Sequence, residues 1–141
     1  MESVVRLPRG YRADRRARER ALTCLAQAGL EDIAGQPAGS VPHGTQRLVE
    51  IVRAIAADPL FLLLDEPAAG LSPVEIDSFR RLVRAMADAG VGVLLVEHNV
   101  PLVLGLADEV TVLHRGRRIA HGEPAGVRRD PDVMRVYLGA A

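Results

Sequence analysis

The sequence predicts an α/β fold with a mostly parallel sheet and a helical portion at its N-terminal end. Two short segments, 60–64 and 91–96, are apolar without alternation, as expected of strands buried on both faces of a parallel sheet. Helical patterns follow both segments, and a strand–helix–strand order is typical of parallel α/β sheets. With 141 residues, the chain is long enough to form one hydrophobic core.

The helical portion covers residues 1–57 and precedes the sheet portion, residues 58–141. Residues 1–10 are expected to be an irregular lead-in. Apolar residues at helical spacing predict helices over about 13–28 and 45–57. The Gly- and Pro-rich segment between them, 34–44, predicts a loop.

In the sheet portion, Ser72 is placed to cap a helix, because Pro73 suits a first helical turn. The pair Arg115-Gly116 lies between two strand-like segments and predicts a hairpin. The expected elements are strands at 60–64 and 91–96, helices at 73–89 and 100–106, hairpin strands at 110–114 and 117–121, and two short helices in the tail, the last at about 132–138.

Composition limits the possible functions. Basic and acidic residues balance at 18 each, so net charge does not indicate a nucleic-acid or anionic lipid partner. The longest apolar run is much shorter than the ~20 residues that span a bilayer, and the first residues lack the apolar run of a signal peptide. We therefore expect a cytoplasmic protein whose membrane association depends on a partner. The single cysteine, Cys24, is expected to be a small buried hydrophobic residue.

Asp65 and Glu66 directly follow the first apolar strand and precede a proline. The carboxyl ends of parallel strands face the ligand crevice, so both carboxylates are expected there. Asp65 would bind Mg²⁺, which prefers oxygen ligands, and Glu66 would act as general base on a water molecule in line with a terminal phosphate. The alternative is that both side chains only solvate the end of a strand.

His98 follows the second apolar strand in the same way. A neutral imidazole there could hydrogen-bond a phosphate oxygen and the attacking water. Alternatively, the histidine is a capping or solvent-facing residue. The chain contains no lysine, so the phosphate-binding pattern G-x-x-x-x-G-K-[ST] is absent from it.

The series LLLDEP, AAGLSP and LLVEH resembles the Walker B, D-loop and switch-histidine segments of ABC ATPases. The segment VPHGTQ lies where that family has its L-S-G-G-Q signature, and VEIVRAIAADP and ADEVTVLHRGRRIAHGEP are similar to the flanking segments. The resemblance extends from about Leu7 to Gly139. Within the family, GLSPVE and the ending VYLG are most similar to subunits of branched-chain amino-acid importers.

This resemblance implies a P-loop NTPase-type fold that is incomplete in this chain. It implies that Asp65 is the Mg²⁺-associated carboxylate, Glu66 the catalytic base and His98 the switch histidine. The implied D-loop residues are Ala69, Gly70, Leu71 and Ser72, and the implied signature residues are Val41, Pro42, His43, Gly44, Thr45 and Gln46.

Two implied segments depart from the family pattern. Ser72 replaces the usual D-loop aspartate, which puts a carboxylate contact across a dimer in doubt. In the signature Gly44 matches, but Pro42 replaces serine and removes both an amide donor and a hydroxyl. Gly44 and the following helix keep the ability to direct amide groups at a phosphate. Without the family, this segment is an ordinary lead-in to a helix.

The resemblance implies ATP and Mg²⁺ as cofactors, a second ATP-binding subunit as a homo- or heterodimeric partner, and membrane-spanning permease subunits. Without the phosphate-binding loop, the chain alone is expected to bind ATP poorly. Two alternatives stay open: a non-catalytic remnant that pairs with an intact subunit, and an ABC ATPase of DNA repair. The arginine-rich stretch 12–20 is interpreted as a solvated helix face, with a partner contact as the minority interpretation.

Overall fold

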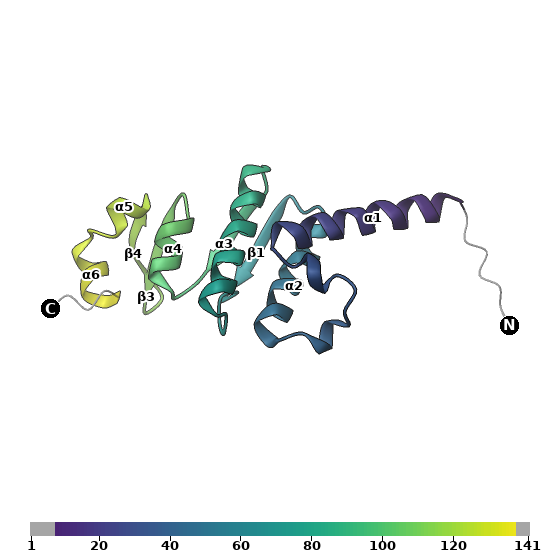
Figure 1. The fold of residues 1–141 in the computed structure, drawn as a ribbon. Helices are drawn as coiled ribbons and strands as arrows, with labels where there is room; N and C mark the ends of the chain where they lie inside the picture. The colour runs from purple at the N-terminus through teal and green to yellow at the C-terminus, as the bar shows by residue number, and fades with distance from the viewer. Residues whose placement is uncertain (1–7, 138–141) are drawn as a thin grey trace. The chain divides into compact units, whose positions relative to one another are not determined.

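The computed structural model describes residues 8–137. The chain divides into two compact units, one ending at Leu94 and the other starting at Leu95. Figure 1 labels the main elements along the chain. In order, they are α1 (Pro8–Gln27), η1 (Glu31–Ile33), η2 (Ala38–Ser40), α2 (His43–Ala56), β1 (Phe61–Asp65), α3 (Pro73–Asp88), β2 (Gly92–Val96), α4 (Val100–Leu106), β3 (Val110–His114), β4 (Arg117–Gly122), α5 (Pro124–Val127) and α6 (Pro131–Tyr137).

Most predicted elements are confirmed to within a few residues, but two helix starts differ. The prediction that residues 8–10 are irregular is wrong, because α1 already begins at Pro8; residues 1–7 lie outside the described part. Proline lacks only an amide hydrogen that the first helical turn does not use, so it starts a helix without penalty. Helix α2 begins at His43, two residues before the predicted start, and η1 and η2 form short turns before it.

The three long helices of the first unit pack against one another and form its core. Apolar side chains spaced three and four residues apart face inward on α2 and α3, as an amphipathic helix requires. Cys24 on α1 is buried, as predicted, and burial raises the pKa of its thiol against the opposing effect of the Arg20 charge. The buried residues of α2 and α3 are Leu48, Ile51, Val52, Ile55, Ser78, Phe79, Leu82, Val83 and Met86.

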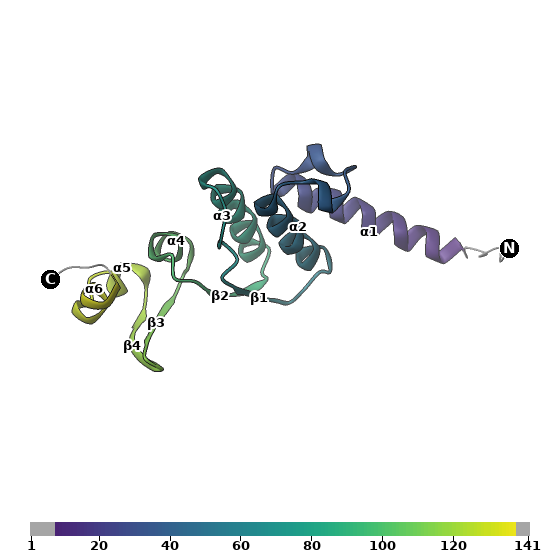
Figure 2. The same ribbon diagram turned by 90° about the horizontal axis from the view of Figure 1, so that it is seen from below.

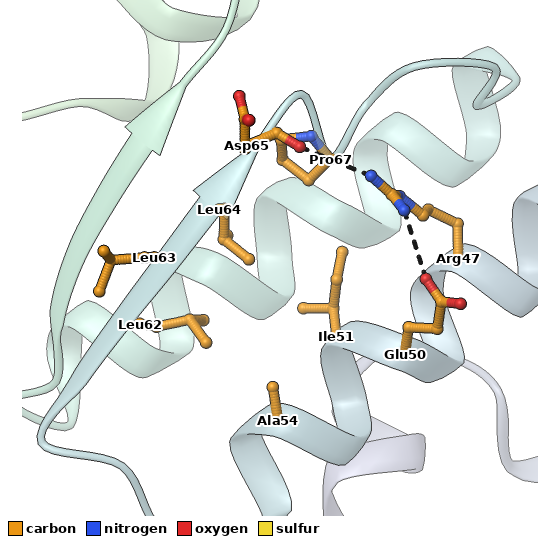
Figure 3. Close-up of a pocket in the computed structure, with 9 residues that line it drawn as sticks. All are labelled: Arg47, Glu50, Ile51, Ala54, Leu62, Leu63, Leu64, Asp65 and Pro67. Carbon is orange, nitrogen blue, oxygen red and sulfur yellow. Dashed lines mark hydrogen bonds and ion pairs between the residues drawn. The ribbon is translucent and has the colours of Figure 1, made fainter.

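Strands β1 and β2 are neighbours in a two-stranded parallel sheet. The Gly92 amide donates to the Leu60 carbonyl over 3.0 Å. Side chains alternate along β1: Leu62 is 5% exposed and Leu63 is 72% exposed. Figure 3 shows them pointing to opposite sides of the strand. The prediction that 60–64 is buried on both faces is therefore wrong, because only the face toward the helices is covered in the first unit.

A glycine of β2, Gly92, lies close to a side chain of β1. A Cβ added at Gly92 would overlap the ring of Phe61, which leads β1. The close approach leaves no room for a side chain at Gly92. The second strand is only partly buried as well, since Leu94 is exposed.

The second unit contains the predicted hairpin (Figure 2). Strands β3 and β4 pair antiparallel, with His114 opposite Arg117 and an irregularity between Val112 and Leu113. Arg115 and Gly116 both have positive φ, 48° and 75°. Two such residues form the two-residue turn whose twist matches paired strands, and glycine adopts this conformation readily.

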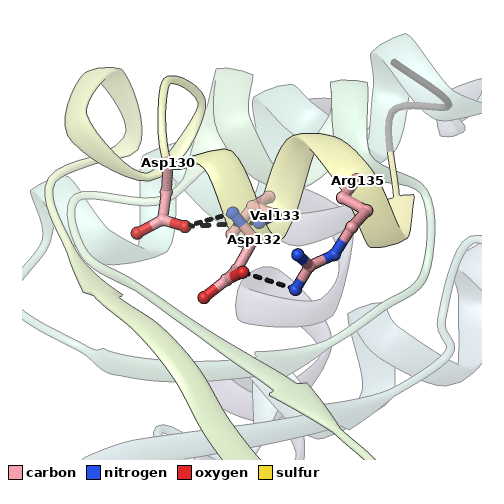
Figure 4. Close-up of polar contacts among 4 residues, drawn as sticks. All are labelled: Asp130, Asp132, Val133 and Arg135. Carbon is pink, nitrogen blue, oxygen red and sulfur yellow. Dashed lines mark hydrogen bonds and ion pairs between the residues drawn. The ribbon is translucent and has the colours of Figure 1, made fainter. Parts of the chain in front are cut away.

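Short helices complete the second unit around a small apolar cluster of Val110, Val127 and Val133. Asp130 caps α6: its Oδ1 accepts hydrogen bonds from the Asp132 and Val133 amides (Figure 4). At the end of α6, the Tyr137 hydroxyl donates to the Leu113 carbonyl over 2.6 Å. Helices α5 and α6 confirm the two short helical pieces predicted for the tail; the predicted end at residue 138 lies outside the described residues.

Within residues 8–137, none of the helices combines the length and hydrophobicity that crossing a bilayer requires. The predicted division into a helical portion, 1–57, and a sheet portion, 58–141, stays a prediction. The compact units that the structure defines have their boundary at Leu94 and Leu95 instead.

Candidate functional site

Asp65 and Glu66 lie at the carboxyl end of β1, as predicted. Asp65 is the last residue of the strand and Glu66 the first residue beyond it, and both are exposed. The buried residues Leu62 and Leu64 fix the strand against the helices. A strand held by its buried side chains thus presents two adjacent carboxylates to solvent, and carboxylates are groups that can bind a metal ion or act as a general base.

Glu66 has an unusual backbone conformation. Its φ is 43°, in the left-handed region that residues other than glycine rarely adopt. The chain turns directly afterwards, with the Ala69 amide donating to the Glu66 carbonyl over 3.2 Å and the Leu71 amide to the Ala68 carbonyl over 3.2 Å. Such a conformation costs about 1–3 kcal/mol and is concentrated at functional sites. The backbone therefore leaves the direction of the strand at Glu66.

The segment 69–72 leads from this turn into α3. Ser72 has extended backbone torsions and its hydroxyl accepts a hydrogen bond from the Glu75 amide over 3.4 Å, while the Glu75 carboxylate accepts one from the Ser72 amide over 2.9 Å. This reciprocal pair is a capping box. The predicted role of Ser72 as the cap of this helix is confirmed, and the turn is thereby fixed to the start of α3.

The segment 41–46 forms the start of α2. Val41 is buried and the Gln46 side chain donates to the Val41 carbonyl over 2.8 Å, so the segment is closed on itself. Pro42 is the N-cap and provides no side-chain hydrogen bond to the helix. The first amides of a helix have no acceptor within it. Those of α2 therefore lack a side-chain cap, and the positive end of the helix dipole favours an anion there.

Glu75 also connects the two segments. The Thr45 hydroxyl donates to Glu75 Oε1 over 3.2 Å, and the Ser72 hydroxyl donates to Oε2 over 2.7 Å. A Cβ added at Gly44 would lie only 2.6 Å from Glu75 Cδ and would overlap the carboxylate. The hydrogen bonds from the Ser72 amide, the Ser72 hydroxyl and the Thr45 hydroxyl together lower the pKa of Glu75, against the opposing effect of burial.

His98 follows β2, as predicted, and is exposed. It belongs to the unit that starts at Leu95, whereas Asp65 and Glu66 belong to the other unit. The predicted meeting of Glu66 and His98 at one crevice therefore stays a prediction. The capping role that His98 could have had belongs to its neighbour: Asn99 Oδ1 accepts a hydrogen bond from the Leu102 amide over 3.1 Å at the start of α4.

A shallow pocket of about 210 Å³ lies between α2 and β1 (Figure 3). Its lining is mainly apolar, with Arg47, Glu50 and Asp65 as the charged members. Arg47 forms an ion pair with Glu50 over 3.3 Å, and its Nη2 lies 3.5 Å from the Asp65 carbonyl oxygen. This arginine links α2 to the end of β1. The lining includes none of the residues 41–46 or 69–72.

The donor set suits a magnesium nucleotide better than a metal held by protein alone. In the described part of the chain, no group of three or more His, Cys, Asp and Glu side chains is arranged to hold a metal ion. Mg²⁺ in nucleotide sites typically takes one or two carboxylates and completes its shell with phosphate oxygens and water. One strand-end carboxylate, that of Asp65, is a ligand of this kind.

Three residues of this region were not predicted from the sequence. Arg47, Glu75 and Asn99 were overlooked although two of them carry a recognisable signal. Ser72 and Glu75 have the S-x-x-E spacing of a capping box, and Asn99 followed by Pro101 has the residue types of a helix start. The contacts of Glu75 with Thr45 and of Arg47 with Asp65 join residues far apart in sequence, which no local pattern reveals.

Two family models and several curated proteins match this chain. The family model described as "ABC transporter" matches residues 2–69, and the model described as "Branched-chain amino acid ATP-binding cassette transporter" matches residues 117–141. The high-affinity branched-chain amino acid transport ATP-binding protein BraF of Pseudomonas aeruginosa is 37% identical over 142 residues, which cover 100% of this chain and 56% of BraF. LivG of Escherichia coli K12, described in the same words, is 38% identical over 98% of this chain and 54% of its own length.

Solved structures have the same fold. The ADP conformation of MJ1267, an ATP-binding cassette of an ABC transporter, superposes with a TM-score of 0.73 at 32% identity, covering 86% of this chain and 50% of MJ1267. CbiO1 from Clostridium perfringens, part of the transporter complex cbiONQ, gives a TM-score of 0.73 at 27% identity, over 94% of this chain and 51% of its own. The chain thus spans about half the length of the curated relatives it matches.

Proposed function

Since this chain belongs to the family of ABC transporter ATP-binding subunits and corresponds to their C-terminal part, we propose that it supplies the hydrolytic carboxylates and the signature segment of such a subunit. The transporter would be an importer of branched-chain amino acids, the substrate class named for BraF and LivG. The observation that supports this most is the end of β1, where a rigid strand presents Asp65 and Glu66 and the backbone of Glu66 has a φ of 43°.

The proposed roles follow from the chemistry of each group. Asp65 holds Mg²⁺, which when bound neutralises charge on phosphate oxygens. Glu66 accepts a proton from the attacking water, and His98 orients that water and a terminal phosphate oxygen by hydrogen bonds. The exposed position of all three residues leaves their side chains accessible to a nucleotide.

The second proposed contribution goes to a different nucleotide. The start of α2, residues 41–46, directs uncapped amides and the helix dipole at a phosphate held by a second ATP-binding subunit. Residues 69–72 lie beside this contact, because Glu75 joins Ser72 to Thr45. The partner subunit would be a second copy or a relative. Permease subunits would hold the assembly at the inner, cytoplasmic face of the membrane.

The chain alone would be inactive, because its sequence contains no lysine and therefore no G-x-x-x-x-G-K-[ST] loop, whose amides and lysine make most phosphate contacts. Calorimetric titration with Mg-ATP tests this. The chain alone should give negligible heat. The chain joined to the part of BraF outside the matched region should bind at micromolar concentration. Micromolar binding by the chain alone would refute the proposed dependence, and no binding by the joined protein would refute the proposed site.

A further inference from the structure

The carboxylate of Glu75 accepts more hydrogen bonds than the capping of α3 requires. A capping box requires only that it accept a hydrogen bond from the Ser72 amide, which it does over 2.9 Å. It also accepts hydrogen bonds from the Ser72 hydroxyl at 2.7 Å and, thirty residues away in sequence, from the Thr45 hydroxyl at 3.2 Å. Its two oxygens are thus divided, Oε2 toward α3 and Oε1 toward α2.

The start of α2 is shaped to receive this carboxylate. A methyl group at Gly44 would overlap both carboxylate oxygens, so the absence of a side chain at this position makes room for Glu75. The hydrogen bonds from Ser72 and Thr45 also lower the pKa of Glu75, as expected when charged acceptors are held by several donors. The carboxylate is therefore ionised and oriented at neutral pH.

We propose that Glu75 is a positioning residue that fixes the start of α2 against the turn before α3, and so holds segments 41–46 and 69–72 in one geometry. The proposal rests on the proposed function in so far as both segments face nucleotide. Glu75 itself would touch neither ATP nor Mg²⁺. It acts through the hydroxyl groups of Thr45 and Ser72, which lie in the implied signature and D-loop segments.

Amide NMR of the whole chain during acid titration tests the link without nucleotide. The amide resonances of Gly44, Thr45 and Ser72 should titrate together, with one midpoint below the ordinary glutamate pKa of about 4.3. A residue that served only as the cap of α3 would move Ser72 and leave Gly44 and Thr45 unchanged. The substitution Glu75→Gln should remove the shared transition at all three positions.

The neighbouring charged groups allow a matched control. His43 and Arg47 lie within two residues of Thr45 on α2, and Asp77 lies within two residues of Glu75 on α3. Asp77 is the only other carboxylate within two residues of Thr45 or Glu75, so it provides the matched control. The variant Asp77→Asn should keep the shared transition. The proposal is overturned if Asp77→Asn removes it, or if Thr45 does not follow Ser72.

A second pair of variants keeps the test decisive if Glu75→Gln folds poorly. The change Gly44→Ala should displace the carboxylate and eliminate the Thr45 response to acid, while the Ser72 response persists. In a Glu75→Ala background, Gly44→Ala should cause no further shift at Ser72, because the overlap is gone. Full retention of the Thr45 response in Gly44→Ala would contradict the packing on which the proposal depends. Because neither titration contains ATP, failure of the proposed function would leave these results unaffected.

Discussion

Helices α2 and α3 begin in different ways although a proline stands at or next to each start. Helix α3 is closed by its own residues, since Ser72 and Glu75 form a capping box. Helix α2 has Pro42 as N-cap and receives no side-chain hydrogen bond from it. Both starts contact the same carboxylate, Glu75, but α3 uses it to satisfy a backbone amide and α2 only through a side-chain hydroxyl.

This difference distinguishes a helix start whose amide is already hydrogen-bonded from one whose amides are available to a ligand. An amide that already donates to a carboxylate, as that of Ser72 does, has no free capacity for a phosphate. The uncapped amides of α2 keep that capacity, together with the positive end of the helix dipole. Sequence resemblance implies the same assignment, with the signature segment at α2. The uncapped start of α2 supports that proposed assignment.

The largest effect is expected from removing the packing that places both starts. Leu48 on α2 is 1% exposed, and Leu48→Ala should lower the free energy of unfolding by about 2–5 kcal/mol, through lost burial and the cavity left behind. Urea denaturation measures this. The control Val74→Ala, at a residue 76% exposed on α3, should change stability by less than about 0.5 kcal/mol. Equal losses would show that α2 is not fixed by this core.

A smaller effect should come from the cap that distinguishes α3. The substitution Ser72→Ala removes the hydroxyl that the Glu75 amide donates to and should cost about 1 kcal/mol. Thermal and urea unfolding provide the measurement. Ser40→Ala is a matched control, because the Ser40 hydroxyl only donates to the nearby Pro37 carbonyl in a surface turn. If Ser72→Ala left the free energy of unfolding unchanged, the proposed energetic difference between the two helix starts would be contradicted.

The smallest effect is the pH dependence that Glu75 contributes. Its pKa is lowered in the folded chain by the Ser72 and Thr45 hydrogen bonds. The stabilisation is therefore fully present above the unfolded pKa of about 4.3 and is lost as pH falls through the lowered folded value. Urea midpoints compared at pH 7 and in this acid range should fall less in Glu75→Gln than in the unsubstituted chain. An identical fall in both proteins would contradict the lowered pKa.

Local sequence patterns predicted the elements well. The hairpin at Arg115-Gly116, the helix from Val100 to Leu106 and the cap at Ser72 were all confirmed. Each is set by a turn or a cap whose residues are close together in sequence. The early start of α1 at Pro8 was missed because proline and glycine were interpreted as irregular, although proline is compatible with a first helical turn.

Burial and tertiary contacts were less predictable. The run 60–64 is uniformly apolar, which indicated burial on both faces, yet Phe61 and Leu63 are exposed. Apolar composition indicates that a strand can be buried, but the elements that pack against it decide which of its faces are buried. The candidate site shows the same limit: Asp65 and Glu66 were located from the strand that precedes them, whereas the link from Glu75 to Thr45 requires the fold.

Hydrolysis of Mg-ATP by the chain joined to the part of BraF outside the matched region tests the proposed role of the β1 strand end most directly. Glu66→Gln should reduce the rate by about 10²–10⁴-fold, because the general base is removed while the carboxylate's shape and the fold are kept. Mg-ATP binding measured on the same variant should persist. An unchanged rate in Glu66→Gln would contradict the assignment of Glu66 as the base.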